Sequence, residues 1–293
     1  MRDAIGIIGL GLIGGSLARA LKRARPSLEI VGADADADSR AQAVGAGAID
    51  RGYALTEAPL ESCGLVVLAV PGPTLLAILP EVAARLAPGA ILSDVGGSKG
   101  PICAAAAAQA HALFVGAHPM AGTEFRGFAA SRVDLFDGCV VAQCAPRGGP
   151  ASVTDADREA AAKRVTELWT LAGAARVLNV DPEEHDRAVT FASHLPYLAA
   201  AAVTEALIDS GAVAPLAREL AAGGFRDTTR LAGDGTVSGA AAQNRFLPDA
   251  ARALAKVLTD YADRLEAAPE PLRTHLARLA DERRAMKLPI RKA

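Results

Sequence analysis

Residues 5–16 read IGIIGLGLIGGS, a short apolar run followed by three glycines in the spacing Gly-X-Gly-X-X-Gly. The apolar run predicts a buried strand, and the helix-forming residues from Leu17 onward predict a helix directly after the glycines. In such a turn Gly9 allows the tight bend, Gly11 lets a pyrophosphate approach the backbone, and Gly14 lets the helix pack closely on the strand. The stretch therefore predicts a dinucleotide site at a helix N-terminus.

A carboxylate follows the second apolar run. Asp34 comes 20 positions after Gly14 (34 − 14), where a side chain can accept hydrogen bonds from the ribose hydroxyls of an adenosine. Asp36 and Asp38 follow, and no arginine stands before Arg40, so a ribose 2′-phosphate would meet repulsion. We therefore expect NAD rather than NADP. The predicted cofactor-binding residues are Gly9, Gly11, Leu12, Ile13, Gly14, Asp34, Val70 and Pro71.

The pattern of elements divides the chain into two parts. Up to about residue 180, apolar runs alternate with helical stretches, which predicts a mostly parallel sheet of the Rossmann-type α/β class. After Asp181, a plausible N-cap followed by Pro182, only helical spacing remains. We expect a dinucleotide-binding domain over 1–180 and an all-α domain over 181–293. The predicted strands are Ile5–Ile8, Glu29–Ala33, Leu65–Val70, Ala90–Asp94, Leu113–Ala117, Val140–Cys144 and Ala175–Val180, and the predicted long helices are Asp155–Leu171, His185–Ser210, Pro248–Ala267 and Pro271–Ala285.

Charge and composition exclude several classes of protein. The chain has 31 Lys and Arg against 33 Asp and Glu, so it lacks the single-sign field that holds nucleic acid or an anionic membrane. It shows no secretory signal, and no stretch reaches the roughly 18 to 20 charge-free apolar residues of a membrane span. The four cysteines form no Cys-X-X-Cys pair, so no metal site is predicted. We expect a cytoplasmic protein that binds neither nucleic acid nor membrane.

Three segments carry polar residues in apolar surroundings. Residues 116–124 read GAHPMAGTE and place His118 at the end of a predicted strand, the edge at which such sheets bind ligands. Residues 192–197 read ASHLPY, and residues 223–230 read GGFRDTTR, in which two arginines four positions apart could share one helical face. Taken singly, each of these histidines and arginines also has an ordinary structural interpretation.

The three segments together resemble those of a known enzyme family. With GLGLIGGS (9–16), SDVGGSKG (93–100), LFDG (135–138) and the His-Asp-Arg of 185–187, they are similar to motifs of the prephenate and arogenate dehydrogenases of tyrosine biosynthesis. The resemblance implies an NAD-dependent oxidative decarboxylation, either of prephenate to 4-hydroxyphenylpyruvate or of arogenate to tyrosine. In both reactions, loss of the ring carboxylate as CO2 gives an aromatic product.

The resemblance also implies roles for individual residues. His118 matches the family's catalytic histidine, which as a neutral base accepts the proton of the ring hydroxyl while hydride leaves the same carbon. Arg230 matches the arginine that holds a substrate carboxylate in its planar fork. The implied substrate-binding residues are Arg230, Arg226, His194, Ser193, Thr123 and Tyr197.

Two positions depart from the family pattern. Many members have a serine directly after Asp-X-Gly that contacts the catalytic histidine, whereas here Gly97 stands at that place and Ser98 follows. Ser98 is therefore the predicted catalytic partner of His118, through a shifted loop. Tyr197 stands where prephenate-using members commonly have a second histidine. This exchange leaves arogenate, or both substrates, open.

Two other functions remain as alternatives. Another oxidoreductase of Rossmann-plus-helical type would rely on a lysine in the helical part, where Lys256 is the only lysine between residues 164 and 286. A protein that senses NAD without catalysis would leave His118 and Arg230 without a task.

The helical part also predicts a partner. The apolar stretch Leu198–Leu207 is too long for a small domain to cover by itself, so we expect a homodimer through the helical domains. No βαββαβ pattern follows the helices, and no regulatory domain of that type is expected.

Overall fold

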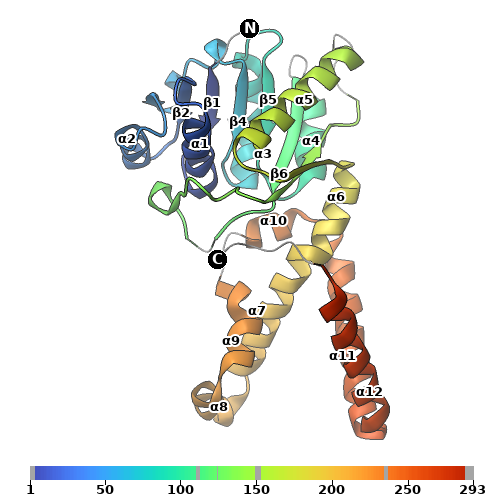
Figure 1. Cartoon of the computed structure of the whole chain (residues 1–293). Coiled ribbons are helices and arrows are strands. Elements are labelled where there is room, and N and C mark those ends of the chain that lie inside the picture. The colour runs from blue at the N-terminus through green and yellow to red at the C-terminus, as the bar shows by residue number, and fades with distance from the viewer. Residues whose placement is uncertain (1–3, 110–112, 124, 149–152, 234–236, 288–293) are drawn as a thin grey trace.

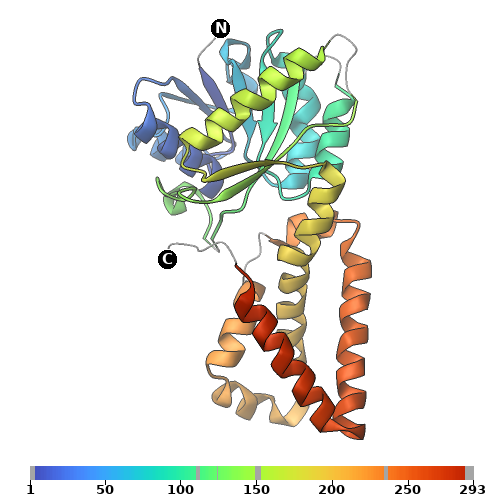
Figure 2. The ribbon, with the colours of Figure 1, turned by 45° about the vertical axis from the view of Figure 1, so that its right-hand side comes forward.

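The computed structural model describes residues 4–109, 113–123, 125–148, 153–233 and 237–287. These residues form an α/β part built on one sheet and an all-helical part that extends away from it (Figures 1 and 2). The chain passes from one part to the other between β8 (Arg176–Asn179) and α6 (Pro182–Val189). The predicted fold class, a mostly parallel sheet followed by helices, is confirmed.

The sheet of the described residues has eight strands in the order β3-β2-β1-β4-β5-β6-β7-β8. Neighbouring strands are parallel except β6 and β7, which are antiparallel with His118 opposite Ala142. The order reverses between β1 and β4, and ligands of such sheets bind beyond the carboxyl ends of the strands at that point. The other strands are β1 (Ile5–Ile8), β2 (Ile30–Ala33), β3 (Arg51–Tyr53), β4 (Leu65–Leu68), β5 (Ile91–Asp94), β6 (Leu113–Pro119) and β7 (Val140–Cys144).

Helices cover both faces of this sheet. Successive side chains of β4 point to opposite faces, so Val67 packs in the core with α1 and α5, and Val66 packs in the core with α3 and α4. Burial on both faces explains why the strands are almost continuously apolar. The helices of this part are α1 (Leu12–Ala24), α2 (Ala37–Gly45), α3 (Gly72–Arg85), α4 (Lys99–Ala107) and α5 (Asp155–Leu171).

The helical part begins at the predicted cap. The Asp181 side chain accepts hydrogen bonds from the amides of Glu183 (2.9 Å) and Glu184 (3.3 Å), and Pro182 occupies the first turn. The helix continues through a π-helical turn, Thr190–His194, into α7. The helical part has two diverging arms, one made of α7–α9 and the other of α11–α12 (Figure 1). The remaining helices are α7 (Leu195–Ile208), α8 (Ala214–Leu220), α9 (Gly223–Thr229), α10 (Val237–Gln243), α11 (Leu247–Ala267) and α12 (Pro269–Ala285).

One strand of the sheet was not predicted from the sequence. β3 (Arg51–Tyr53) is a three-residue strand at the edge of the sheet. It has no apolar run, because an edge strand with an exposed Arg51 need not be buried on both faces, and a pattern search therefore cannot detect it.

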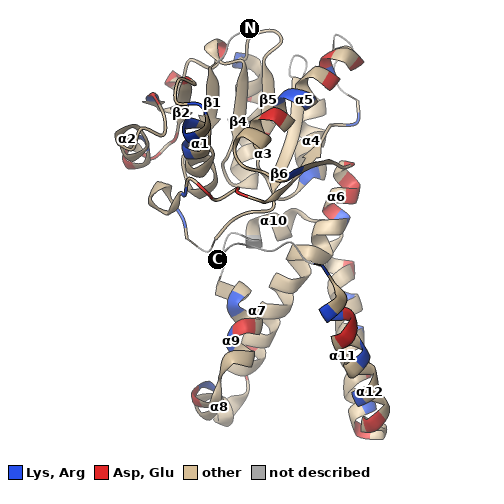
Figure 3. Ribbon diagram, viewed as in Figure 1, with Lys and Arg blue, Asp and Glu red and all other residues tan. Residues whose placement is uncertain are grey.

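The helical part exposes much apolar surface. The continuous helix Pro182–Ile208 is long and apolar enough to cross a membrane by length and composition, although a single such helix is weak evidence of a span. Figure 3 shows that α7 carries few charges, whereas α11 and α12 carry both signs. The large exposed apolar side chains of these helices and their connections include Phe191, Leu198, Val203, Ile208, Val213, Leu216, Leu220, Val257, Leu258, Leu265 and Leu276.

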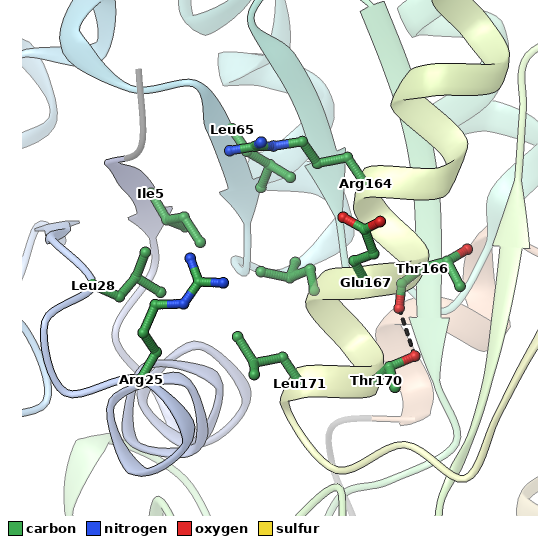
Figure 4. Close-up of a pocket in the computed structure, with 10 residues that line it drawn as sticks. Ile5, Arg25, Leu28, Leu65, Arg164, Thr166, Glu167, Thr170 and Leu171 are labelled. Carbon is green, nitrogen blue, oxygen red and sulfur yellow. Dashed lines mark hydrogen bonds between the residues drawn. The ribbon is translucent and has the colours of Figure 1, made fainter. Parts of the chain in front are cut away.

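A cavity of about 570 Å³ lies at the amino ends of β1 and β4, whereas the glycine turn follows the carboxyl end of β1 (Figure 4). Its lining includes Ile5 and Leu65, which begin β1 and β4, Arg25 after α1, and Glu167 of α5. Because ligands of parallel sheets bind beyond the carboxyl ends of the strands, this cavity is distinct from the site described next.

Candidate active site

The glycine turn has the geometry that its sequence predicts. Gly9 has a φ of +95°, a conformation that L side chains rarely adopt. A Cβ on Gly14 would fall on the carbonyl oxygen of Gly9, whereas a Cβ on Gly11 would meet no atom of the described residues within 4 Å. No side chain caps the N-terminus of α1 at Gly11. The turn therefore leaves open space and uncapped amides where a pyrophosphate would bind.

The remaining cofactor candidates surround this turn. Val70 follows β4, and its Cγ1 would lie 2.8 Å from a Cβ on Gly9, while Pro71 is the N-cap of α3. Asp34 follows β2, and its carboxylate accepts hydrogen bonds from the amides of Leu10 (2.6 Å) and Asp36 (2.9 Å). These bonds tie the carboxylate to the turn. Leu12 and Ile13 form the first turn of α1.

Three side chains form a hydrogen-bonded chain at the carboxyl end of β6. His118 Nδ1 lies 2.9 Å from His185 Nε2, and His185 Nδ1 lies 2.8 Å from Asp186 Oδ1. The carboxylate can only accept, so His185 donates from Nδ1 and, when neutral, accepts at Nε2. His118 then donates from Nδ1 and keeps its Nε2 lone pair free. The arrangement sets His118 up as a base at Nε2.

The carboxylate at the end of this chain is firmly held. Asp186 also accepts hydrogen bonds from the amides of Lys99 (2.7 Å) and Gly100 (2.8 Å) in the first turn of α4. Burial alone would raise the pKa of Asp186, but the bonds from His185 and these amides outweigh it and hold the pKa below its usual 3.8. Asp186 therefore stays ionised and keeps His185 in the donating orientation.

His118 is kept neutral by its surroundings. Burial lowers its pKa well below the ordinary value of 6.5, and the nearby His185, Lys99 and His194 lower it further. Both effects disfavour the charged imidazolium, so His118 is unprotonated near neutral pH.

A buried ion pair supports the strand that carries His118. The Lys99 ammonium contacts the Asp94 carboxylate, with both side chains fully buried, and donates to the carbonyl of Ala117 at 2.8 Å. Asp94 in turn accepts hydrogen bonds from the amides of Gly96 (2.7 Å) and Ala117 (3.2 Å). The pair therefore fixes the carboxyl ends of β5 and β6 relative to each other.

Gly97 lies beside the free nitrogen of His118. A Cβ at Gly97 would be 3.7 Å from His118 Nε2 but only 2.9 Å from the Cβ of Ala240 in α10. The neighbouring Ser98 donates its hydroxyl to the carbonyl of Ala240 at 2.9 Å. No hydrogen bond joins Ser98 to His118 within the part of the chain that is described. The structure thus gives Ser98 a contact between domains, and its catalytic role remains a prediction.

The second histidine lies in the π-helical turn. His194 is buried, and its Nδ1 lies 3.0 Å from Asn244 Nδ2. Burial lowers the pKa of His194, Asp186 raises it and His185 lowers it, with a net lowering. A π turn inserts one extra residue per turn and often occurs at functional sites. Ser193, in the same turn, is half-buried.

The other predicted substrate residues lie apart from this cluster. Arg230 directly follows α9 and is exposed, as is Arg226, whose Nε lies 4.0 Å from Asp227. Within the described residues, neither arginine makes a hydrogen bond or ion pair with His118, His185 or His194. Thr123 accepts a hydrogen bond from the amide of Phe125 (3.3 Å), and Tyr197 is half-buried in α7. Glu124 of the same motif lies outside the described residues.

Four residues of this cluster were not predicted from the sequence as site residues: Lys99, His185, Asp186 and Asn244. The signal for the first three was present in the quoted motifs SDVGGSKG and His-Asp-Arg. Asn244 carried no such signal. The described residues contain no group of three or more His, Cys, Asp or Glu side chains that could hold a metal ion.

Two family models match the chain. Residues 17–177 match the model of the prephenate dehydrogenase nucleotide-binding domain, and residues 181–278 match that of the prephenate dehydrogenase dimerization domain. Together they cover most of both parts of the structure.

Individual relatives agree with these models. A prephenate dehydrogenase of Bacillus subtilis (strain 168) is 33% identical over 235 residues, which make up 79% of this chain and 61% of the relative. The chain thus spans about three fifths of that relative's length. The structure is similar to that of prephenate dehydrogenase from A. aeolicus in complex with hydroxyphenyl propionate and NAD+ (TM-score 0.82, 28% identity, 97% of this chain and 98% of that chain).

A second solved structure is that of Synechocystis arogenate dehydrogenase (TM-score 0.75, 28% identity, 96% of this chain and 98% of that chain). Both domain models, in their order along the chain, and the relatives over most of its length lead to the same assignment. The chain belongs to the prephenate dehydrogenase family.

Proposed function

We propose that this protein is an NAD-dependent dehydrogenase that oxidatively decarboxylates prephenate to 4-hydroxyphenylpyruvate. The observation that carries the proposal is the Asp186–His185–His118 chain, which leaves a neutral His118 with a free Nε2 at the carboxyl edge of the sheet. A base at this edge, beyond a glycine turn fit for a dinucleotide, is what removal of a hydroxyl proton beside a nicotinamide requires.

The chain's own residues supply positioning and proton transfer. When bound, NAD supplies the acceptor for the hydride that leaves the ring carbon bearing the hydroxyl. His118 Nε2 takes the hydroxyl proton, and the positive charge that develops on its ring is stabilised through His185 by the ionised Asp186. Loss of the ring carboxylate as CO2 then aromatises the ring, and the proton returns to the product oxygen.

We assign the two parts of the chain to the two ligands. Residues 1–180 hold the dinucleotide, and residues 181–293 complete the substrate site and bind a second copy. Arg230 is proposed to hold a substrate carboxylate with Arg226 as a second basic residue, and His194, Ser193, Thr123 and Tyr197 are proposed to line the same site.

NAD is the preferred cofactor in this proposal. Asp34 would accept hydrogen bonds from the ribose hydroxyls, and its negative charge would repel a 2′-phosphate. The next basic residue along the chain, Arg40, is engaged by the backbone, since its Nη1 donates to the carbonyls of Asp34 (2.7 Å) and Ala35 (3.1 Å). A 2′-phosphate would have to displace these bonds.

Arogenate is the second candidate substrate. It differs from prephenate only in an amino group where prephenate has a keto group, and Tyr197 stands where prephenate-using relatives commonly have a histidine. The solved Synechocystis relative is an arogenate dehydrogenase of the same fold.

The exposed apolar side chains of the two helical arms support a homodimer. Two of them among the described residues, Leu220 and Leu265, are more than 60% exposed in the single chain. Burial of apolar surface drives association, and the matching family model is that of a dimerization domain.

The proposed activity is tested by NADH formation from purified protein offered prephenate and arogenate, each with NAD and with NADP. We expect turnover with NAD and at least one substrate. Light scattering on the same sample should give twice the 29.9 kDa chain mass. Absence of turnover with all four pairs, despite measurable NAD binding, would overturn the proposal.

The pH dependence of the reaction should reflect the low pKa of His118. The base acts only when neutral, and burial and its neighbours lower its pKa well below 6.5. The acid limb of a plot of kcat/KM against pH should therefore lie below pH 6.5, with a plateau above it. An acid limb centred at or above pH 6.5 would contradict the assignment of His118 as the base.

The contact between Gly97 and Ala240 predicts how a serine would behave at position 97. Gly97→Ser alone should lower stability by about 1–3 kcal/mol, because its Cβ would overlap that of Ala240. Adding Ala240→Gly removes the overlap and should recover the stability lost in Gly97→Ser, with kcat/KM changing in the same direction. Urea unfolding and kcat/KM of both variants, with Ala240→Gly as control, measure this. A fully stable Gly97→Ser protein would show that the contact is not tight.

A further inference from the structure

Asn244, in the segment between α10 and α11, joins His194 to the main chain of α6. Its Nδ2 lies 2.9 Å from the carbonyl oxygen of Asp186, 2.9 Å from Thr190 Oγ1 and 3.0 Å from His194 Nδ1. Its Oδ1 accepts a hydrogen bond from the amide of Phe246 at 3.0 Å. All of these side-chain contacts except the one to Phe246 are buried.

Two main-chain groups decide how the Asn244 amide is oriented. A carbonyl can only accept and a backbone N–H can only donate, so Nδ2 must face Asp186 O and Oδ1 must face Phe246 N. The opposite orientation would bring two acceptors together at Asp186 and two donors together at Phe246. The side-chain amide is therefore fixed by groups that do not titrate.

This orientation determines the protonation of His194. An amide NH2 has no lone pair to offer, so a hydrogen on His194 Nδ1 would meet no acceptor there, and Nδ1 is therefore the nitrogen without a hydrogen. A neutral His194 then carries its hydrogen on Nε2. Protonation of Nδ1 would set N–H against N–H, so Asn244 also opposes the charged form. The titratable groups acting on His194 are Asp186 and His185 of α6, and His194 in turn acts on His118 of β6.

We propose that Asn244 is a positioning residue that holds His194 as a neutral Nε2–H donor toward an oxygen of the bound substrate or cofactor. The inference rests on the proposed function for the identity of the ligand, but not for the tautomer. In the same site, His118 presents an accepting Nε2 and His194 a donating Nε2. Asp186 acts on both histidines. Its side chain holds His185, which leaves Nε2 of His118 as an acceptor. Its carbonyl holds Asn244, which leaves Nε2 of His194 as a donor.

The tautomer is tested directly by NMR of the unliganded protein with 15N-labelled histidine, with His194→Gln used to assign the resonances. We expect His194 Nδ1 to resonate as an unprotonated nitrogen and Nε2 as a protonated one near neutral pH. A protonated Nδ1 in the wild-type protein would overturn the inference, whether or not the protein turns over prephenate or arogenate.

Asn244→Asp gives the second test, because it replaces the donor by an acceptor of the same shape. We expect Nδ1 of His194 to become protonated and kcat/KM to fall about tenfold to a hundredfold, the loss expected when a buried hydrogen bond is reversed. The acid limb of the pH profile should move upward as His194 titrates. The matched control is Asn179→Asp, whose Oδ1 accepts from Gln143 in the sheet at 3.0 Å and should leave both readouts unchanged.

The outcomes separate the inference from the proposed function. Wild-type turnover together with an Asn244→Asp variant that matches wild type in kcat/KM and pH profile would overturn the inference alone. If the wild-type protein turns over neither substrate, the proposed function fails and the NMR result still decides the tautomer. If Asn244→Asp does not fold, the wild-type spectrum decides.

Discussion

Replacing His118 by asparagine is expected to lower kcat by about a hundredfold to ten-thousandfold, the contribution typical of a general base. The Asn amide can still donate to His185 Nε2 as His118 Nδ1 does over 2.9 Å, so the surrounding chain of hydrogen bonds is kept. What is lost is the free nitrogen that accepts the proton. The measurement is steady-state turnover of prephenate and arogenate with NAD.

The control separates chemistry from binding. NAD affinity, measured by calorimetry, should be unchanged, because the glycine turn and Asp34 are untouched. His275→Asn, a histidine of α12 that contacts Tyr261 and Arg278, should turn over at the wild-type rate. A His118→Asn protein with more than a tenth of wild-type kcat would exclude His118 as the base.

Replacing Lys99 by methionine is expected to reduce the free energy of unfolding by about 3–5 kcal/mol, the range found when one partner of a buried ion pair is removed. The change leaves the Asp94 carboxylate buried without its counter-ion and removes the donor to the Ala117 carbonyl. Methionine retains the length of the lysine stem, so the loss reflects charge more than packing. Urea unfolding followed by circular dichroism measures it.

A partly exposed pair provides the comparison. Lys22 and Asp50 also form an ion pair, at 2.8 Å, but Asp50 is 42% exposed. Lys22→Met should therefore cost no more than about 1 kcal/mol. Adding Asp94→Asn to Lys99→Met should recover part of the loss, since no charge then remains buried. Equal effects of Lys99→Met and Lys22→Met would show that burial of the Asp94 pair is not what stabilises the sheet edge.

Local sequence was sufficient for most of the fold. Strands buried on both faces must be almost continuously apolar, so β1 and β4 could be located within a residue or two. The short edge strand β3 could not, because burial imposes no pattern on it. The helix start at Asp181 and Pro182 was predictable because capping depends on neighbours in the chain.

Some residues of the candidate site could likewise be predicted from the sequence, and others could not. The glycine turn and Asp34 could be identified from spacing alone, because the turn geometry and the place of Asp34 directly after β2 are set by residues close together in the chain. His118 was found at the strand end. Its partners His185 and Asp186 lie 67 and 68 positions further along the chain (185 − 118 and 186 − 118), and no spacing rule connects them.

By itself, the sequence determined the class of fold, the dinucleotide turn and the histidine at the carboxyl edge, because strand burial, helix capping and glycine turns are set by residues close together in the chain. Only the tertiary structure decided which nitrogen of His118 is free and which group faces Nδ1 of His194, because these depend on contacts with α6 and with Asn244. It also decided that Ser98 bonds Ala240 and that Gly97 has no room for a side chain. These contacts form where α10 of the helical part packs against the edge of the sheet, and such packing leaves no local signature in the sequence.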